Sequence, residues 1–262
     1  LLGFVVTSAL GHHLLPWQTL FGMAALISLT SIIVQFRIPI AAYPVSIVEQ
    51  NWSEKILHPW RDAFHLLRSN PHFFRVQCGF MFGGVGLMLA APSLSLFCVD
   101  ILALSHTDIT LGRSVLMGIG VAVSAYFWKK MIAMEKIDQI LRNVLLGFSL
   151  YLLCLCVSYF EVSFFYLAYV LYGLSQAGSH LLWNLSGPMF AKEADSAQYT
   201  RVNILMVGLR GSITPAIGGV LCHCCGPAFV ILLSAGICLA GVLYMTITQT
   251  VIGRRQKQLL DH

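Results

Sequence analysis

Five polar residues lie inside long apolar stretches of the sequence, where their side chains could take part in chemistry. Gln176, His180 and Asn184 follow one another at intervals of four residues, so a helix would place them on one face. Asn203 and Arg210 are seven residues apart and would share a face of the next apolar stretch. Amide, imidazole and guanidinium groups hydrogen-bond small polar or anionic molecules. We therefore predict that these five residues contribute to a substrate-binding site.

Arg210 has the strongest chemical implication, because a charged side chain in hydrocarbon needs a partner. By helical rise, Arg210 lies roughly 12 Å from the basic end of its stretch, and Gln176 and His180 lie roughly 16 Å and 10 Å from theirs. No carboxylate occurs in the apolar stretches after residue 75. Three partners remain open for Arg210: an anionic substrate, a carboxylate in helices upstream of this chain, or a backbone carbonyl.

The other polar residues have two interpretations each. Histidine is the side chain that changes charge near neutral pH, so proton coupling would use His180 or helices outside this chain. His180 could equally be a neutral imidazole bonded between helices, and Gln176 and Asn184 could be polar contacts that hold helices together. Arg113 lies near the edge of its apolar stretch, where its side chain reaches the lipid headgroups, so we predict no functional role for it.

The elements that must position these residues are apolar helices. Hydrophobic residues make up 57% of the sequence and charged residues 10%, and the mean hydropathy is +0.78. The apolar residues come in runs of about 20, the length that a helix needs to cross hydrocarbon. Alternating strands that could close a barrel are not seen. We predict an all-α integral membrane protein, a multi-pass helical bundle in a lipid bilayer.

The sequence divides into four segments. Residues 1–36 carry two spans, the first of them cut short, and residues 37–75 form a polar linker. Residues 76–250 carry six spans, with tight turns expected at Glu161 and at 223–226, and residues 251–262 form a tail. The predicted full-length spans are 17–36, 76–99, 111–128, 143–160, 163–187, 202–222 and 227–250. Because neither an initiator Met nor a basic stretch precedes the first apolar run, we expect the chain to be N-terminally incomplete.

The linker carries a helix signal of its own. Pro59 precedes Trp60 and Phe64, which belong to an apolar stripe at helical spacing. Proline is favoured in the first turn of a helix, so this pattern predicts a short helix that begins near Pro59 and lies on the membrane surface. An irregular loop is the alternative. Asn70 followed by Pro71 is typical of the start of the next helix.

Basic residues alternate with the spans. Lys and Arg lie in the linker, between 129 and 142, between 192 and 201, and in the tail, whereas the intervening loops carry Asp100, Asp108 and Glu161 without any Lys or Arg. By the positive-inside rule, the linker and the C-terminus are cytoplasmic in a multi-pass protein of the cell (inner or plasma) membrane. The net charge of +5 then reflects topology, and we expect no nucleic-acid partner.

A basic linker that follows two helices and leads into six resembles the join between the halves of a major facilitator superfamily transporter. The Trp-Lys-Lys segment at 128–130 is similar to the superfamily's loop between helices eight and nine, and Arg210, Gly211 and Pro215 are similar to its kinked eleventh helix. The resemblance implies that residues 1–36 are helices five and six of twelve, so four helices would be missing upstream. It also implies alternating access, with a coupling ion as an additional partner.

The predicted function is therefore a secondary active transporter of a small solute, which is anionic if Arg210 contacts it. The alternative is a polytopic protein that does not transport, such as a membrane enzyme, a receptor or an assembly factor, and such a protein would need no water-filled cavity. We predict no catalytic residue, cofactor or metal site. Metalloprotease, P-loop and dinucleotide motifs are absent from the sequence, and the Cys-His-Cys-Cys segment at 222–225 lacks the spacing of zinc ligands.

Overall fold

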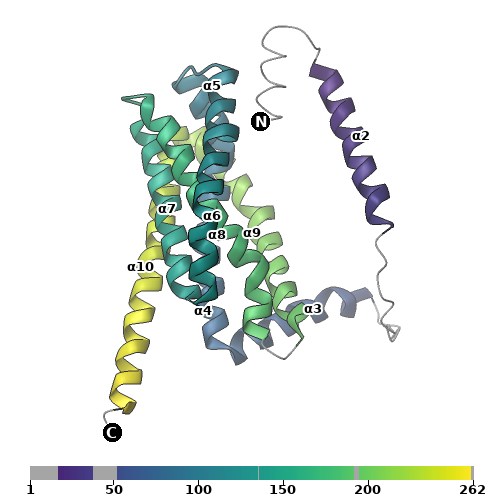
Figure 1. Cartoon of the computed structure of the whole chain (residues 1–262), viewed down its shortest axis with the longest axis vertical. Helices are drawn as coiled ribbons and strands as arrows, with labels where there is room; N and C mark the ends of the chain where they lie inside the picture. Colours follow the sequence, from purple (N-terminus) through teal and green to yellow (C-terminus); the bar gives the residue numbers. More distant parts are fainter. Residues whose placement is uncertain (1–16, 38–51, 135, 192–194, 261–262) are drawn as a thin grey trace.

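The computed structural model describes residues 17–37, 52–134, 136–191 and 195–260. Within these residues the regular elements are all helical and no strand occurs, as the sequence predicts. The first predicted span, at the start of residues 1–36, lies outside the described part of the chain. The second is present as α2 (Trp17–Gln35), which stands apart from the other helices in Figure 1.

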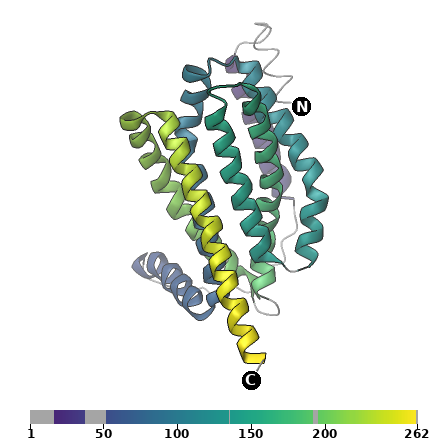
Figure 2. The same ribbon diagram turned by 90° about the vertical axis from the view of Figure 1, so that its left-hand side faces the viewer.

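The chain after the linker forms one bundle of long helices that run up and down (Figures 1 and 2). Its elements are α4 (Pro71–Leu96), the π-helix η1 (Phe97–Ile101), α5 (His106–Thr110), the π-helix η2 (Leu111–Leu116), α6 (Met117–Ala133), α7 (Ile137–Val157), α8 (Ser163–Ala191), α9 (Ser196–Cys225) and α10 (Pro227–Leu260). The six spans predicted after the linker lie on these helices, except that the span predicted at 143–160 extends three residues beyond the end of α7.

Five helical segments are long and apolar enough to cross a membrane, among the residues that the structure describes. They are Pro71–Ile101, His106–Ala133, Ile137–Val157, Ser196–Cys225 and Pro227–Val251. At 29 residues α8 is also long enough, but polar side chains such as Gln176 and His180 lower its hydropathy. This set of helices is that of an all-α, multi-pass membrane protein.

The core of the bundle is built around α7, which packs against α4, α8 and α10. Ile140, Val144, Phe148 and Leu152 recur every four residues along α7, and all four are buried. Ser149 is buried as well, and its hydroxyl donates a hydrogen bond of 3.1 Å to the backbone carbonyl of Ala235 on α10. The helix therefore holds its neighbours together mainly through one apolar stripe.

Two glycines let α6 and α8 approach each other closely. A Cβ on Gly120 would lie only 2.5 Å from the carbonyl oxygen of Val170, and a Cβ on Gly173 would overlap the backbone of Met117. Beside this crossing, the Trp128 indole nitrogen donates a hydrogen bond of 2.7 Å to the carbonyl of Leu174. These contacts fix α8, the helix that carries three of the predicted site residues.

The predicted linker helix exists, but it does not begin at Pro59. It is α3 (Trp52–Ser69), and Pro59 lies inside it. The helix lies across the end of the bundle (Figures 1 and 2), and of its side chains from residue 57 to 69 Ala63 is the one that is buried, so water or headgroups can hydrate the backbone carbonyl that loses its N–H partner at Pro59. The predicted cap after it is confirmed, since Asn70 Oδ1 accepts a hydrogen bond of 3.0 Å from the backbone N–H of Phe73.

The connections between the last helices differ from the sequence-based expectation at two places. The turn at Glu161 is present between α7 and α8, but the loop expected at 223–226 is reduced to Gly226, because α9 continues through Cys225. Gly226 has φ = +83°, a conformation that glycine adopts at low cost. The expected tail at 251–262 is not a separate segment either, since α10 continues through Leu260.

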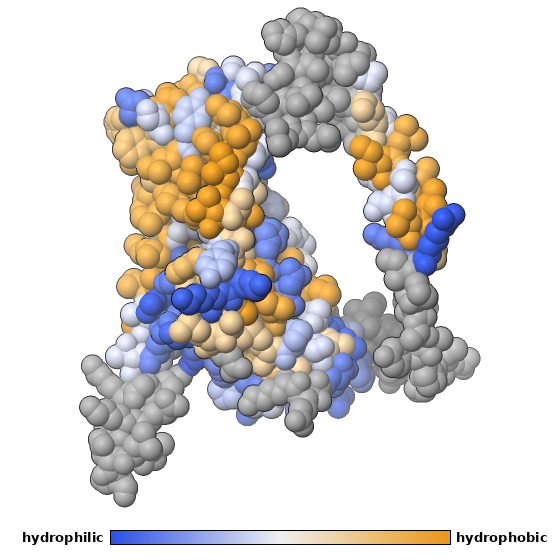
Figure 3. All heavy atoms as spheres, viewed as in Figure 1, coloured by the Kyte–Doolittle hydropathy of each residue, from blue (hydrophilic) through white to orange (hydrophobic). Residues whose placement is uncertain are grey.

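The two ends of the bundle carry different charges. The turns after α6 and α8 lie at the same end as α3, and Lys129, Lys130 and Arg201 belong to this end. Asp108 and Glu161 belong to the opposite end, near α5. Figure 3 shows apolar side chains over the upper part of the bundle and hydrophilic ones around its lower end. The basic and acidic connections that alternate along the sequence therefore lie at opposite ends of the bundle.

Candidate solute-binding site

Arg210 reaches from α9 to the neighbouring helix α4. Its Nη1 donates a hydrogen bond of 2.6 Å to the backbone carbonyl of Phe80. Of the three partners left open by the sequence, the backbone carbonyl is thus the one that the described residues supply. A guanidinium carries five N–H donors, and the buried Nε has no hydrogen-bond partner among the described residues. Because Nε is buried, an anion beside Arg210 would have to be bound by the terminal N–H groups that Phe80 does not use.

Gly84 makes room for this guanidinium. A Cβ at Gly84 would overlap the Cζ, Nη1 and Nε atoms of Arg210, so any other residue at this position would displace the guanidinium. The carbonyl that Arg210 contacts belongs to Phe80, one helical turn earlier on α4. Gly84 therefore sets the position of the Arg210 charge. No local pattern in the sequence indicates this role of Gly84.

A cavity of about 300 Å³ opens beside Arg210, between α4, α7, α8 and α9. Its lining includes Phe80, Gly84, Gln176, Ser179 and Arg210. The structure thus brings together two of the five predicted site residues, Gln176 and Arg210, from different helices. No carboxylate is among the described residues that line the cavity, so its fixed charge is positive. Such a cavity favours an anion over a cation.

His180 and Asn184 lie on the exposed side of α8 and do not line this cavity. The Nε2 atoms of Gln176 and His180 are 3.0 Å apart. With the Gln176 amide as donor, the imidazole accepts at Nε2, which requires its neutral form with the proton on Nδ1. Asn184 Nδ2 donates to the backbone carbonyl of His180 over 2.8 Å, a bond within one helix. His180 is thus linked to the cavity only through Gln176.

Asn203 lies in a buried polar cluster away from Arg210. Its Oδ1 accepts a hydrogen bond from Gln77 on α4, and its Nδ2 donates one of 3.0 Å to the hydroxyl of Ser186 on α8. All three residues are buried, so the cluster joins α4, α8 and α9 through satisfied polar groups. The structure places Asn203 outside the cavity, although it shares a helix face with Arg210 by spacing.

We next compared the chain with known proteins. No family model, no curated protein and no solved structure matches it. The residues of the cavity and the pattern of the helices are therefore the features that indicate a function.

A second cavity, of about 420 Å³, adjoins the first. It is lined in part by Arg113 of η2 and by Tyr151, Tyr169 and Tyr172, and it shares Tyr172 with the cavity at Arg210. Two of the tyrosines could have been found from spacing, because Tyr169, Tyr172 and Gln176 are three and four residues apart and share one helix face. Arg113, which its sequence position places near the lipid headgroups, is exposed and also lines this cavity.

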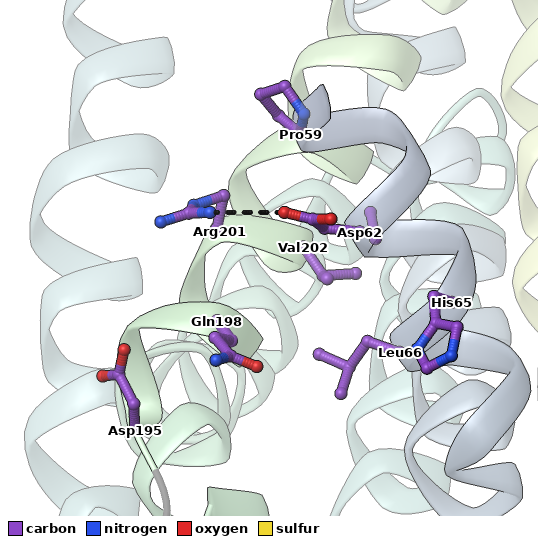
Figure 4. A pocket seen from close by; sticks show the side chains of 9 residues that line it. Pro59, Asp62, His65, Leu66, Asp195, Gln198, Arg201 and Val202 are labelled. Atoms are coloured by element: carbon purple, nitrogen blue, oxygen red, sulfur yellow. Dashed lines mark ion pairs between the residues drawn. The ribbon is translucent and has the colours of Figure 1, made fainter. Parts of the chain in front are cut away.

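Another pocket lies between the linker helix and the start of α9, outside the bundle (Figure 4). Asp62 of α3 faces Arg201 of α9 across it, with 4.0 Å between Oδ2 and Nη1, and both side chains are about half exposed. Below this pair, Ala63, Phe73 and Val202 form a small buried cluster that seats α3 on the bundle. The pocket is open to solvent and lies outside the bundle. The ion pair in it therefore suits a contact that holds α3 in place rather than a transport site.

Proposed function

We propose that the protein is a secondary active transporter that moves a small anionic solute by alternating access. The observation that carries this proposal is the cavity at Arg210, where a guanidinium with unused donors and the Gln176 amide converge inside an apolar bundle. A charge in such surroundings is costly, and charged side chains within membrane spans typically mark substrate or ion pathways. A protein held together by packing alone would not need to maintain it.

The helices around this cavity carry features that permit rearrangement. Pro92, Pro188 and Pro215 lie inside α4, α8 and α9, and each removes a backbone hydrogen bond where a helix can bend. The π-helices η1 and η2 end α4 and precede α6, and π-helical turns occur often at functional sites. These features support a bundle in which helices change their tilt around a bound solute.

The order of the helices supports a major facilitator type of transporter. In this proposal α2 is the sixth helix of twelve, α3 belongs to the linker, and α4 to α10 form the second half. The remaining helices of the first half would lie upstream, and they would cover the cavity from the other side. The basic end of the bundle, with α3 and the end of α10, would face the cytoplasm of a plasma or inner membrane.

Uptake into proteoliposomes tests this proposal. The full-length protein would be reconstituted, the vesicles loaded with an unlabelled solute, and uptake of the same labelled solute compared with that of protein-free vesicles. The panel would contain phosphate, aliphatic dicarboxylates, aromatic acids and neutral sugars. We expect counterflow of at least one anion and of no neutral sugar. Exchange of sugars without anions would contradict the anionic assignment, and the absence of all counterflow would favour a protein that does not transport.

A further inference from the structure

We propose that the solute is an elongated organic dianion with an apolar or aromatic centre, bound at one end by Arg210 and at the other by Arg113. This inference rests on the proposed function and specifies its substrate class. The cavity at Arg210 and the cavity at Arg113 meet at Leu87, Ala91 and Tyr172, which line both of them. A single ligand can therefore occupy both cavities.

Each end of this double cavity offers a guanidinium. Arg210 uses one terminal donor for the carbonyl of Phe80 and lines one of the two cavities, so its other terminal N–H groups are the ones that a ligand there would contact. Arg113 has no ion-pair partner in the described part of the chain. No described carboxylate lines either cavity, so neither charge is neutralised from within. Two unneutralised guanidinium groups in adjoining cavities favour a ligand with two anionic groups.

The length of the double cavity limits the length of the ligand. Along α4, the guanidinium of Arg210 lies beside Gly84, whereas the cavity at Arg113 extends from Leu87 to Leu94. At a helical rise of about 1.5 Å per residue, the near end of that cavity lies about 5 Å and its far end about 15 Å from Gly84 along α4. A ligand that fills both cavities is therefore much longer than one phosphate or one carboxylate, and its acidic groups would lie at opposite ends.

The centre of the double cavity is apolar and aromatic. Tyr151 and Tyr172 have ring centroids 4.7 Å apart, and Tyr151 and Tyr169 have theirs 5.8 Å apart. Leu87 and Ala91 of α4 complete the wall at the point where the cavities meet. An aromatic or other apolar middle would pack against these rings and bury its surface. A compact, strongly hydrated dianion would leave this region unused.

Binding of a length series of rigid diacids tests the inference. The full-length protein in phosphatidylcholine nanodiscs would be titrated calorimetrically with terephthalate, naphthalene dicarboxylate and biphenyl dicarboxylate, and with biphenyl monocarboxylate. We expect the longest diacid to bind on the order of tenfold more tightly than the monoacid, because it adds one charge-assisted contact. Arg113→Ala and Arg210→Ala should each reduce its affinity to that of the monoacid.

Arg201→Ala is the matched control, since it removes a positive charge from α9 outside both cavities. Thermal unfolding would verify that each variant is folded, and Arg113→Gln would replace Arg113→Ala if the latter is not. Equal binding of diacid and monoacid, or an Arg113→Ala effect no larger than that of Arg201→Ala, would overturn the inference. This outcome differs from a failure of the proposed function. In that case no solute would cross the bilayer in the counterflow measurement, even if a diacid binds.

Discussion

Replacement of Arg210 by alanine is expected to lower anion uptake on the order of tenfold, because it removes one charge-assisted contact with the anion. Arg210→Lys should restore only part of the rate, since an ammonium group cannot match the forked donors of a guanidinium. The initial rate of labelled anion uptake into proteoliposomes is the measurement. Transport of neutral solutes at an undiminished rate by Arg210→Lys, with anion uptake unchanged, would show that Arg210 does not select the solute.

Gly84→Ala examines the same site without removing the charge. The new Cβ would occupy the place of the guanidinium, which can move away because it is the end of a flexible side chain. We therefore expect little loss of thermal stability but a marked loss of anion uptake. Gly236→Ala is the control, because a Cβ there would contact nothing within 4 Å. Equal uptake by the two variants would mean that the position of Arg210 beside Phe80 is irrelevant.

Asp138→Ala is expected to destabilise the bundle by about 2 to 3 kcal/mol, the largest effect on stability that we predict. Asp138, at the start of α7, accepts hydrogen bonds of 2.5 Å and 3.3 Å from Arg75 of α4 and one of 3.2 Å from His72. The Arg75 side chain is only 11% exposed, so the variant would leave a largely buried guanidinium without its partner. Thermal unfolding in nanodiscs is the measurement.

The pair of Asp62 with Arg201 provides the control for this prediction. The two side chains are 47% and 53% exposed and their charged atoms are 4.0 Å apart, so Asp62→Ala should cost less than about 1 kcal/mol. The double variant Arg75→Leu/Asp138→Leu should be closer to the unmodified protein than Asp138→Ala, because no unpaired charge is left. If Asp62→Ala and Asp138→Ala destabilise the protein equally, the contact between α4 and α7 contributes no more to stability than an exposed ion pair does.

The sequence predicts those parts of the fold that depend on local composition. Runs of apolar residues located the helices, and Asn70 with Pro71 located the start of α4, because caps and spans are set by residues close in sequence. The start of α3 was not predictable from Pro59. Proline is preferred in a first turn, but here it lies inside the helix. The sequence signal that does agree with a start at Trp52 is Asn51 followed by Glu54 three residues later, a pattern typical of a helix N-terminus.

The candidate site was predictable only in part. Spacing on one helix indicated Gln176, and the cost of a charge in hydrocarbon indicated Arg210. The carbonyl of Phe80 and the space at Gly84 depend on how α4 meets α9, which spacing within a helix does not reveal. Depth along a helix predicted that Arg113 reaches the headgroups but gives no information on direction, so it could not reveal that the exposed side chain also lines the second cavity.

Alternating access is tested most directly by the accessibility of the cavity to water from each side of the membrane. Single cysteines at Gln176 and Ser179 would be introduced into full-length protein whose native cysteines have been replaced, and membrane-impermeant thiol reagents would be added to either face of intact membranes. A cysteine at Ser149, which is buried in the core against Ala235, is the control. We expect both cavity positions to react from both faces and position 149 from neither. Failure of both cavity positions to react from either face, in folded protein, would contradict a transport cavity.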